Sequence, residues 1–261
     1  MLTLRVVKLG GNELDRPDWV SAAARAIAGG GATVVVHGGG RAVTDLSRRL
    51  ALPVEKRDGM RVTTAEVAEV VEMVLSGPVN RLLVTALRSA GLDAIGLSGA
   101  DGGLLSATQM GGGLGYVGEI TRVRTALIES LVLAGLTPVI APVSPDPAGS
   151  PLALNVNADS AAAVVAAALR ASELLFVSDV PGVMVGGVTQ PSLATSDIER
   201  LIADGTAADG MAAKLRAAER ALSGGAQAVR IGNLQMLTEP AVGTRITAPQ
   251  SSVSSVLARS A

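Results

Sequence analysis

The stretch Thr33-Val-Val-Val-His37-Gly38-Gly-Gly40 joins an uninterrupted run of β-branched residues to three glycines. Near the start of the chain, Leu4-Arg-Val-Val-Lys8-Leu-Gly10-Gly11 has a similar arrangement. A short apolar run that ends at glycine is typical of a strand buried on both faces of a parallel sheet. Because ligands of such sheets bind beyond the carboxyl ends of the strands, we expect the binding site to begin at these glycines.

Strand patterns and helix patterns alternate along the rest of the chain. We expect strands at Leu2–Leu9, Thr33–His37, Ala94–Ser98, Thr137–Pro142, Leu174–Ser178 and Ala228–Ile231. We expect helices at Trp19–Ala28, Thr64–Leu75, Pro78–Ala90, Ile120–Ala134, Asp159–Ala171 and Met211–Ser223. Gly102–Gly115 and Ala203–Gly210 have the composition of mobile loops. The alternation predicts an α/β fold with a central, mainly parallel sheet that helices cover on both faces.

The composition excludes several classes of protein. The 261 residues include no cysteine, one histidine and three aromatic residues, and the net charge is −1. Disulfide frameworks, zinc fingers and thiol nucleophiles are therefore excluded, and nothing favours nucleic-acid binding. The best candidate for a membrane span, Leu127–Val143, is interrupted by Glu129 and Pro138, and the start of the chain does not resemble a signal peptide. We expect a cytoplasmic protein that binds small molecules and neither nucleic acid nor a membrane.

Three glycine clusters follow expected strands, the third being Gly96-Leu-Ser-Gly-Ala-Asp-Gly102. Glycine allows backbone N–H groups to approach an anion closely, and a helix that begins just beyond adds a favourable partial charge. Any one cluster could be an ordinary tight turn. Three clusters at strand ends favour a site where two anionic groups meet over one edge of the sheet.

Lysine is rare in this chain, and its positions are informative. The only lysines are Lys8, Lys56 and Lys214. Lys8 precedes the first glycine pair, and Lys214 ends the motif Asp209-Gly-Met-Ala-Ala-Lys214 at the start of an expected helix. Both could be solvated surface charges. As compact point charges beside glycine turns, they also suit the oxygens of a phosphoryl group in transfer.

Other polar residues also lie near the expected edge of the sheet. Arg61 follows a glycine and offers a planar fork for a carboxylate, although spacing alone also allows a surface arginine. Asn155-Val-Asn157-Ala-Asp159 opens an expected helix, so Asn157 or Asp159 could simply cap it. The same amides and carboxylate could hold a ligand. His37 is the only histidine available to a catalytic triad, but its place before three glycines favours a role in positioning the backbone.

Taken in order, these motifs resemble the amino acid kinase family from Leu4 to about Thr247. The resemblance also rests on Ser178-Asp-Val-Pro-Gly182 and Gly243-Thr-Arg-Ile246. It implies a three-layer αβα sandwich with a central, mainly parallel open sheet. It further implies an N-terminal lobe, residues 1–170, for acyl amino acid binding and dimerisation, and a C-terminal lobe, residues 171–261, for ATP binding.

The resemblance also implies roles for single residues. The catalytic residues would be Lys8, Lys214 and Asp159. The substrate would contact Gly38, Gly39, Arg61 and Asn155, and the nucleotide would contact Gly10, Gly11, Ser178, Asp179 and Met211. The cofactors would be ATP and Mg²⁺, with the metal carried mainly by the nucleotide phosphates and no metal site in the protein.

The activity that the resemblance implies is ATP-dependent phosphorylation of the γ-carboxylate of N-acetyl-L-glutamate to N-acetyl-L-glutamyl 5-phosphate, a step of arginine biosynthesis. A carboxylate acceptor is already ionised at pH 7 and needs no general base, which agrees with the scarcity of histidine. We also expect a homodimer that is insensitive to arginine, since no helical extension precedes Leu4.

Two other functions stay open at this point. One is a kinase for the δ-carboxylate of carrier-protein-bound α-aminoadipate in lysine biosynthesis, for which Arg41, Arg57 and Arg61 could grip an acidic carrier. Ala100, at a position where lysine is common in the family, leaves the substrate open, whereas Gly115-Tyr-Val-Gly-Glu119 favours acetylglutamate. The other function is a non-catalytic amino-acid or nucleotide sensor on the same scaffold. The presence of Lys8, Asp159 and Lys214 argues against a sensor.

Overall fold

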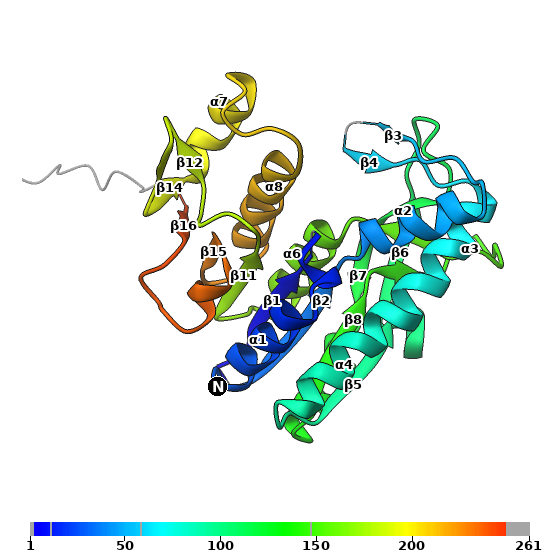
Figure 1. The fold of residues 1–261 in the computed structure, drawn as a ribbon, viewed down its shortest axis with the longest axis horizontal. Helices are drawn as coiled ribbons and strands as arrows, with labels where there is room; N and C mark the ends of the chain where they lie inside the picture. The colour runs from blue at the N-terminus through cyan, green and yellow to red at the C-terminus, as the bar shows by residue number, and fades with distance from the viewer. Residues whose placement is uncertain (1–2, 11, 58, 147, 249–261) are drawn as a thin grey trace, which may run out of the picture.

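The computed structural model describes residues 3–10, 12–57, 59–146 and 148–248, and its centre is an eight-stranded sheet (Figure 1). The strand order is β14-β16-β15-β11-β1-β2-β8-β5. Every neighbouring pair is parallel except β15 and β16. The strands are β1 (Arg5–Leu9), β2 (Thr33–His37), β5 (Ala94–Ser98), β8 (Thr137–Ala141), β11 (Glu173–Val177), β14 (Ser192–Ala194), β15 (Val229–Gly232) and β16 (Thr244–Thr247). The predicted mainly parallel open sheet is confirmed.

Two separate hydrophobic cores lie on opposite faces of this sheet. Val6 of β1 belongs to one core and its neighbour Val7 to the other, because successive side chains of a strand point to opposite faces. The first core contains α5 (Thr125–Leu133), α6 (Ala158–Ala168) and α8 (Asp209–Ser223). The second contains α1 (Pro17–Ala28), α3 (Ala65–Val74) and α4 (Asn80–Ser89). The molecule is thus the expected three-layer αβα sandwich.

The remaining elements lie around the carboxyl ends of the strands and at the outer edges of the main sheet. The helices are α2 (Gly40–Arg49) and α7 (Ile198–Ala203), with 3-10 turns at Asn12–Asp15, Asp101–Gly103, Thr195–Asp197 and Leu234–Leu237. A second sheet has the order β6-β7-β10-β9, formed by β6 (Leu105–Gln109), β7 (Val117–Val123), β9 (Val143–Ser144) and β10 (Leu154–Val156). Two hairpins complete the fold, β3 (Lys56–Arg57) with β4 (Met60–Arg61) and β12 (Met184–Val185) with β13 (Val188–Thr189).

The helix expected over Ile120–Ala134 is wrong in its first part. Residues 117–123 form β7, and α5 begins only at Thr125. β7 pairs with both β6 and β10, so hydrogen bonds to distant segments override the local pattern. For the same reason the segment Gly102–Gly115 is not simply a mobile loop, because it contains β6.

One helical segment of the described residues is long and apolar enough to cross a membrane, but it is a core element of the fold. Residues 65–89 form this segment and run through α3, a π-helical turn at Leu75–Val79 and α4. Half of its most apolar window is buried inside the protein. The segment also bends at Gly77, whose backbone is not helical, and at Pro78, which cannot donate a helix hydrogen bond. Leu127–Val143, the candidate span in the sequence, is divided between α5 and β8.

Candidate active site

The first two glycine turns lie side by side at the carboxyl edge of the main sheet. β1 and β2 are parallel, with Leu9 opposite His37, so both strands end at the same level. The N–H of Gly38 donates to the carbonyl of Leu9 at 2.8 Å. A Cβ added to Gly38 would lie 3.7 Å from Cα of Gly10 and 3.7 Å from Cβ of Ala158. The adjacent strands therefore bring both turns against the start of α6, as the sequence indicates.

Three charged side chains from distant parts of the chain meet beside these turns. Nζ of Lys8 on β1 lies 2.7 Å from Oδ1 of Asp159 on α6, and Nζ of Lys214 on α8 lies 3.8 Å from Oδ2 of the same carboxylate. All three side chains are largely buried, with at most 14% of each exposed. Each carboxylate oxygen faces one ammonium group, so Asp159 holds the two lysines at a fixed separation.

The cap of α6 leaves Asp159 free for this contact. The side chain of Asn157 accepts hydrogen bonds from the N–H groups of Asp159 and Ser160, at 2.9 and 3.0 Å. The sequence allowed either Asn157 or Asp159 as the cap, and the structure assigns that position to Asn157. The carboxylate of Asp159 is consequently not used by the helix terminus and points to the lysines.

The electrostatics of this cluster favour a charged carboxylate. Burial alone would disfavour ionisation of Asp159, but Lys8 and Lys214 outweigh burial and hold the pKa of this carboxyl below its usual value. Burial lowers the pKa of Lys214, and Lys8 lowers it further, while Asp159 and Asp179 act in the opposite direction. The cluster has two cations and one anion, so it carries one excess positive charge that an anionic ligand can neutralise.

Gly10 is required by the position of Lys8. A Cβ on Gly10 would collide with the ammonium group of Lys8, so any side chain there would displace the lysine. Gly11, the other glycine of this pair, lies outside the described residues.

A pocket of about 180 Å³ opens beside the glycine turns, and we call it the Arg61 pocket. It is lined by Gly38, Gly39, Gly40, Lys56, Arg61, Asn155, Asn157 and Ala158, among others. The guanidinium of Arg61 donates through Nη2 to the carbonyl of Gly40 at 2.8 Å and to the hydroxyl of Thr44 at 2.7 Å. Its Nη1 is buried and has no hydrogen-bond partner among the described residues. Burial lowers the pKa of Arg61.

The structure thus brings together the predicted substrate residues. Gly38, Gly39, Arg61 and Asn155 all line the Arg61 pocket. Asn155 also donates to the hydroxyl of Thr63 at 3.1 Å, which fixes the orientation of its amide. Gly38 connects this pocket to Gly10, so the lysine cluster lies near one end of it.

The predicted nucleotide residues are more dispersed. Ser178 and Asp179 follow β11 and line a second, more open pocket of about 520 Å³, together with Trp19 of α1 and Asn233. Met211 lies in the first turn of α8. It packs against the first core, on the face of the sheet opposite to α1. Of these three residues, Asp179 has a link to the lysine cluster, through its electrostatic effect on Lys214, whereas Gly10 lies directly against Lys8.

Sequence reasoning missed two residues that shape the Arg61 pocket. Lys56 lines the pocket from the hairpin β3–β4, and Thr44 orients Arg61 from α2. Lys56 belongs to the rare lysines, which was a usable signal. Thr44 gave none: α2 packs Ala42, Val43 and Leu46 against the second core, but we expected no helix at Gly40–Arg49, and Thr44 is not part of a recognised motif.

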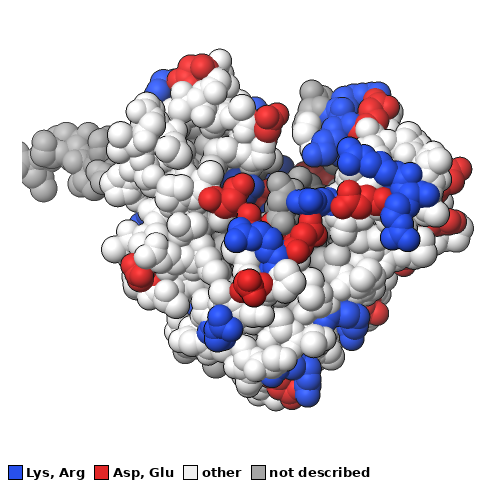
Figure 2. Space-filling view, viewed as in Figure 1, with Lys and Arg blue, Asp and Glu red and all other residues white. Residues whose placement is uncertain are grey.

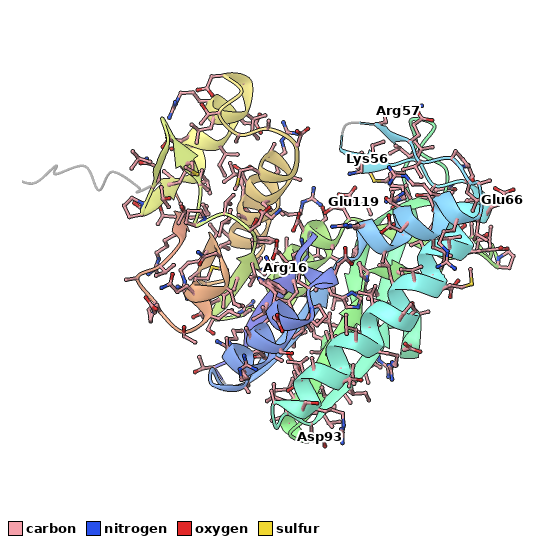
Figure 3. The ribbon with its side chains drawn as sticks, viewed as in Figure 1. Arg16, Lys56, Arg57, Glu66, Asp93 and Glu119 are labelled. Atoms are coloured by element: carbon pink, nitrogen blue, oxygen red, sulfur yellow. The ribbon has the colours of Figure 1, made fainter. Side chains whose placement is uncertain are left out.

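Basic side chains gather at the rim of the site. The space-filling view shows a notch between the part with α7 and α8 and the hairpin β3–β4, with lysine and arginine on the hairpin side (Figure 2). Lys56 and Arg57 project from this hairpin (Figure 3). Arg57 contacts Glu55 at 3.1 Å and the carbonyl of Gly112 at 2.8 Å, and Arg41 pairs with Asp15 at 3.0 Å. Both arginines thus have a partner within the chain and are still about half exposed.

Comparisons with known proteins agree with this architecture. The model of the amino acid kinase family matches residues 3–233. The acetylglutamate kinase of Chloroflexus aurantiacus is 45% identical over 95% of this chain and 98% of its own length. The acetylglutamate kinase of Geobacillus kaustophilus is 45% identical over 84% of this chain and 85% of its own. A crystal structure of a Streptococcus mutans protein superposes with a TM-score of 0.81 at 28% identity, covering 95% of this chain and 99% of that one. From the family match and these relatives, the chain belongs to the amino acid kinase family.

Proposed function

We propose that the chain transfers the γ-phosphoryl group of ATP to the γ-carboxylate of N-acetyl-L-glutamate, giving N-acetyl-L-glutamyl 5-phosphate in arginine biosynthesis. The names of the relatives at 45% identity support this activity. The observation that carries it is the buried Nη1 of Arg61, which has no partner among the residues that the structure describes and lies at a pocket whose other end approaches two buried lysines. An unpaired buried donor is costly unless a ligand completes it.

The Arg61 pocket suits an acylated amino acid. A free α-carboxylate would accept from the unpartnered Nη1 of Arg61, since arginine pairs with carboxylates through its planar fork. The amide of Asn155, held by Thr63, would face the acetamido group. The side-chain carboxylate would then extend toward the glycine turns. This arrangement assigns binding to the pocket and chemistry to its lysine end.

The reaction requires alignment and charge neutralisation. An oxygen of the γ-carboxylate attacks the γ-phosphorus, and the bond from that phosphorus to the β–γ bridging oxygen breaks, so ADP leaves with the electron pair. No proton has to move, because the acceptor is already ionised. Lys8 and Lys214 would stabilise the charge on the transferring phosphoryl group and on the leaving oxygen, and Asp159 would keep them in place.

ATP and Mg²⁺ complete the proposal. Among the described residues, no three His, Asp or Glu side chains gather in a way that could hold a metal ion. We assign Mg²⁺ mainly to the nucleotide phosphates, its usual partners in kinases, where it would supply further charge neutralisation. Residues 1–170 would bind the acyl amino acid and residues 171–261 the nucleotide, with Gly10, Ser178, Asp179 and Met211 on the nucleotide side. The proposed location is the cytoplasm.

One assay tests the activity directly. ADP release is measured with N-acetyl-L-glutamate, free L-glutamate and carrier-bound α-aminoadipate as separate acceptors. We expect turnover with the first only. Turnover with the carrier-bound acceptor alone would identify the lysine-pathway kinase, and no turnover with any acceptor would favour a sensor.

Replacement of Arg61 should weaken binding of the acyl amino acid. A hydrogen bond to a charged group contributes about 1.5–3 kcal/mol, so Arg61→Ala should raise the KM for N-acetyl-L-glutamate by about 10- to 100-fold. Arg61→Lys should raise this KM almost as much, because an ammonium cannot contact Thr44, Gly40 and a carboxylate together. The KM for ATP serves as the internal control and should stay unchanged. An unaltered KM for the acceptor would remove Arg61 from the binding site.

We also propose a homodimer with a dimerisation surface in residues 1–170. Met73 and Leu82 on the α3–α4 segment are large apolar side chains that are 55% and 43% exposed, and a partner subunit could cover them. Sedimentation equilibrium of the wild-type chain and of Leu82→Glu tests this: a monomeric wild type would contradict the proposal.

A further inference from the structure

His37 and Asn80 form a buried polar pair that the proposed reaction does not use. Both are almost fully buried, His37 at the end of β2 and Asn80 at the start of α4. Nδ1 of His37 lies 2.8 Å from the carbonyl oxygen of Gly38, and Nε2 lies 3.1 Å from Nδ2 of Asn80. The imidazole therefore connects the helix α4 to the second glycine turn.

The partners of Asn80 determine which nitrogen of His37 carries the proton. Nδ2 of Asn80 donates to the carbonyl of Val139 at 2.9 Å, and its Oδ1 accepts from Arg81 at 3.1 Å, so the orientation of the amide is fixed from both ends. An amide nitrogen can only donate, so Nε2 of His37 must accept. The proton then lies on Nδ1, which donates to Gly38.

Backbone features hold Asn80 in this position. The π-helical turn at Leu75–Val79 ends directly before it, and such turns occur frequently at functional sites. Gly96 on β5 lies against the amide, and a Cβ there would collide with Oδ1 of Asn80. The glycine at 96 thus makes room for the pair, rather than for a ligand.

The hydrogen bond to Gly38 has a consequence at the Arg61 pocket. In a trans peptide the carbonyl of Gly38 and the N–H of Gly39 point in opposite directions. With this carbonyl held against the buried imidazole, the N–H of Gly39 is directed away from it, and Gly39 lines the pocket. No acceptor for that N–H is found among the described residues. Gly39 also precedes α2, whose first N–H groups favour an anion.

We propose that His37 is a positioning residue: held in one tautomer by Asn80, it aims the backbone N–H of Gly39 at an oxygen of the reacting groups. The inference rests on the proposed kinase function. Burial is the main cause that lowers the pKa of His37 to about 4; Lys8 acts in the same direction and the Gly38 hydrogen bond in the opposite one. The ring therefore keeps its neutral form throughout the working range of pH.

Two isosteric variants separate positioning from simple packing. The amide nitrogen of asparagine can take the place of Nδ1, so His37→Asn can still donate to Gly38. The amide of glutamine takes the place of Nε2, so His37→Gln can reach Asn80 but not the Gly38 carbonyl. Each variant retains one of the two hydrogen bonds of His37. Because a small misplacement in an active site can cost about 10²-fold in rate, we expect kcat to fall 10- to 100-fold in His37→Gln and at most a few-fold in His37→Asn.

Equal kcat losses in both variants, or no loss in either, would overturn the inference. An inactive wild type would instead contradict the proposed function. A second measurement does not depend on variants that fold: selective ¹⁵N labelling of histidine gives a single imidazole, because the chain contains one histidine. We expect its NMR signals to show a protonated Nδ1 and an unprotonated Nε2 from pH 6 to 8. A proton on Nε2, or titration of the ring in this range, would also overturn it.

Discussion

Lys8→Ala and Lys214→Ala are each expected to lower kcat by about 10²–10³-fold, the typical cost of removing one preorganised donor from a site that stabilises developing charge. Each lysine faces its own oxygen of Asp159, so the two ammonium groups occupy different positions and neither can replace the other. The losses should appear in kcat more than in the KM for N-acetyl-L-glutamate, because we assign the binding of that substrate to Arg61.

Lys8→Arg should be as inactive as Lys8→Ala. The ammonium of Lys8 lies so close to Gly10 that even a Cβ there would collide with it, and a guanidinium is larger than this ammonium, so we expect it not to fit. A matched control is Arg88→Ala, which removes an exposed cation paired with Asp93. Asp93 directly precedes β5 and therefore lies at the opposite edge of the sheet (Figure 3). Near-wild-type kcat in either lysine variant would show that its assigned role is wrong.

The parts of the fold that could be predicted from the sequence are those fixed by local patterns. β2 and β5 have the expected bounds to the residue, because their apolar runs stop at glycine and begin after polar or glycine-rich turns. The second sheet could not be predicted. β7 and β10 are adjacent in space although the thirty residues 124–153 lie between them, and the polar Thr121 and Arg122 interrupt the apolar residues of β7.

The residues of the candidate site also divide into those that the sequence could identify and those that it could not. Lys8 and Lys214 could be singled out because lysine is rare, and each stands beside a glycine motif. We expected the glycines of the third cluster to approach an anionic ligand, but Gly96 and Gly99 are required by packing within the protein. Gly96 makes room for Asn80, and a Cβ on Gly99 would collide with the carbonyl of Val143. Composition cannot distinguish a glycine that approaches a ligand from one that approaches the protein's own backbone, because both require the absence of a Cβ.

Asp159→Asn is expected to lower both kcat and the stability of the fold. The amide has nearly the shape of the carboxylate, but it leaves Lys8 and Lys214 facing each other without a counter-charge. Removing one partner of a buried ion pair typically costs about 3–5 kcal/mol, and the free energy of unfolding from urea titration should fall by this order. We expect kcat to fall by about 10²-fold or more, because the two ammonium groups lose the fixed separation that Asp159 imposes.

A triple variant separates these two consequences. In Lys8→Met/Asp159→Val/Lys214→Met none of the three charges of the cluster remains, and replacement of a buried ionic cluster by apolar side chains is often neutral or stabilising. The free energy of unfolding should therefore recover to near the wild-type value or above it, while ADP release stays undetectable. The triple variant would then be as stable as the wild type but inactive, which is the result expected if these charges are retained for phosphoryl transfer. If Asp159→Asn kept wild-type stability and kcat, or if the triple variant stayed as unstable as Asp159→Asn, the cluster would not be the balanced catalytic unit proposed here.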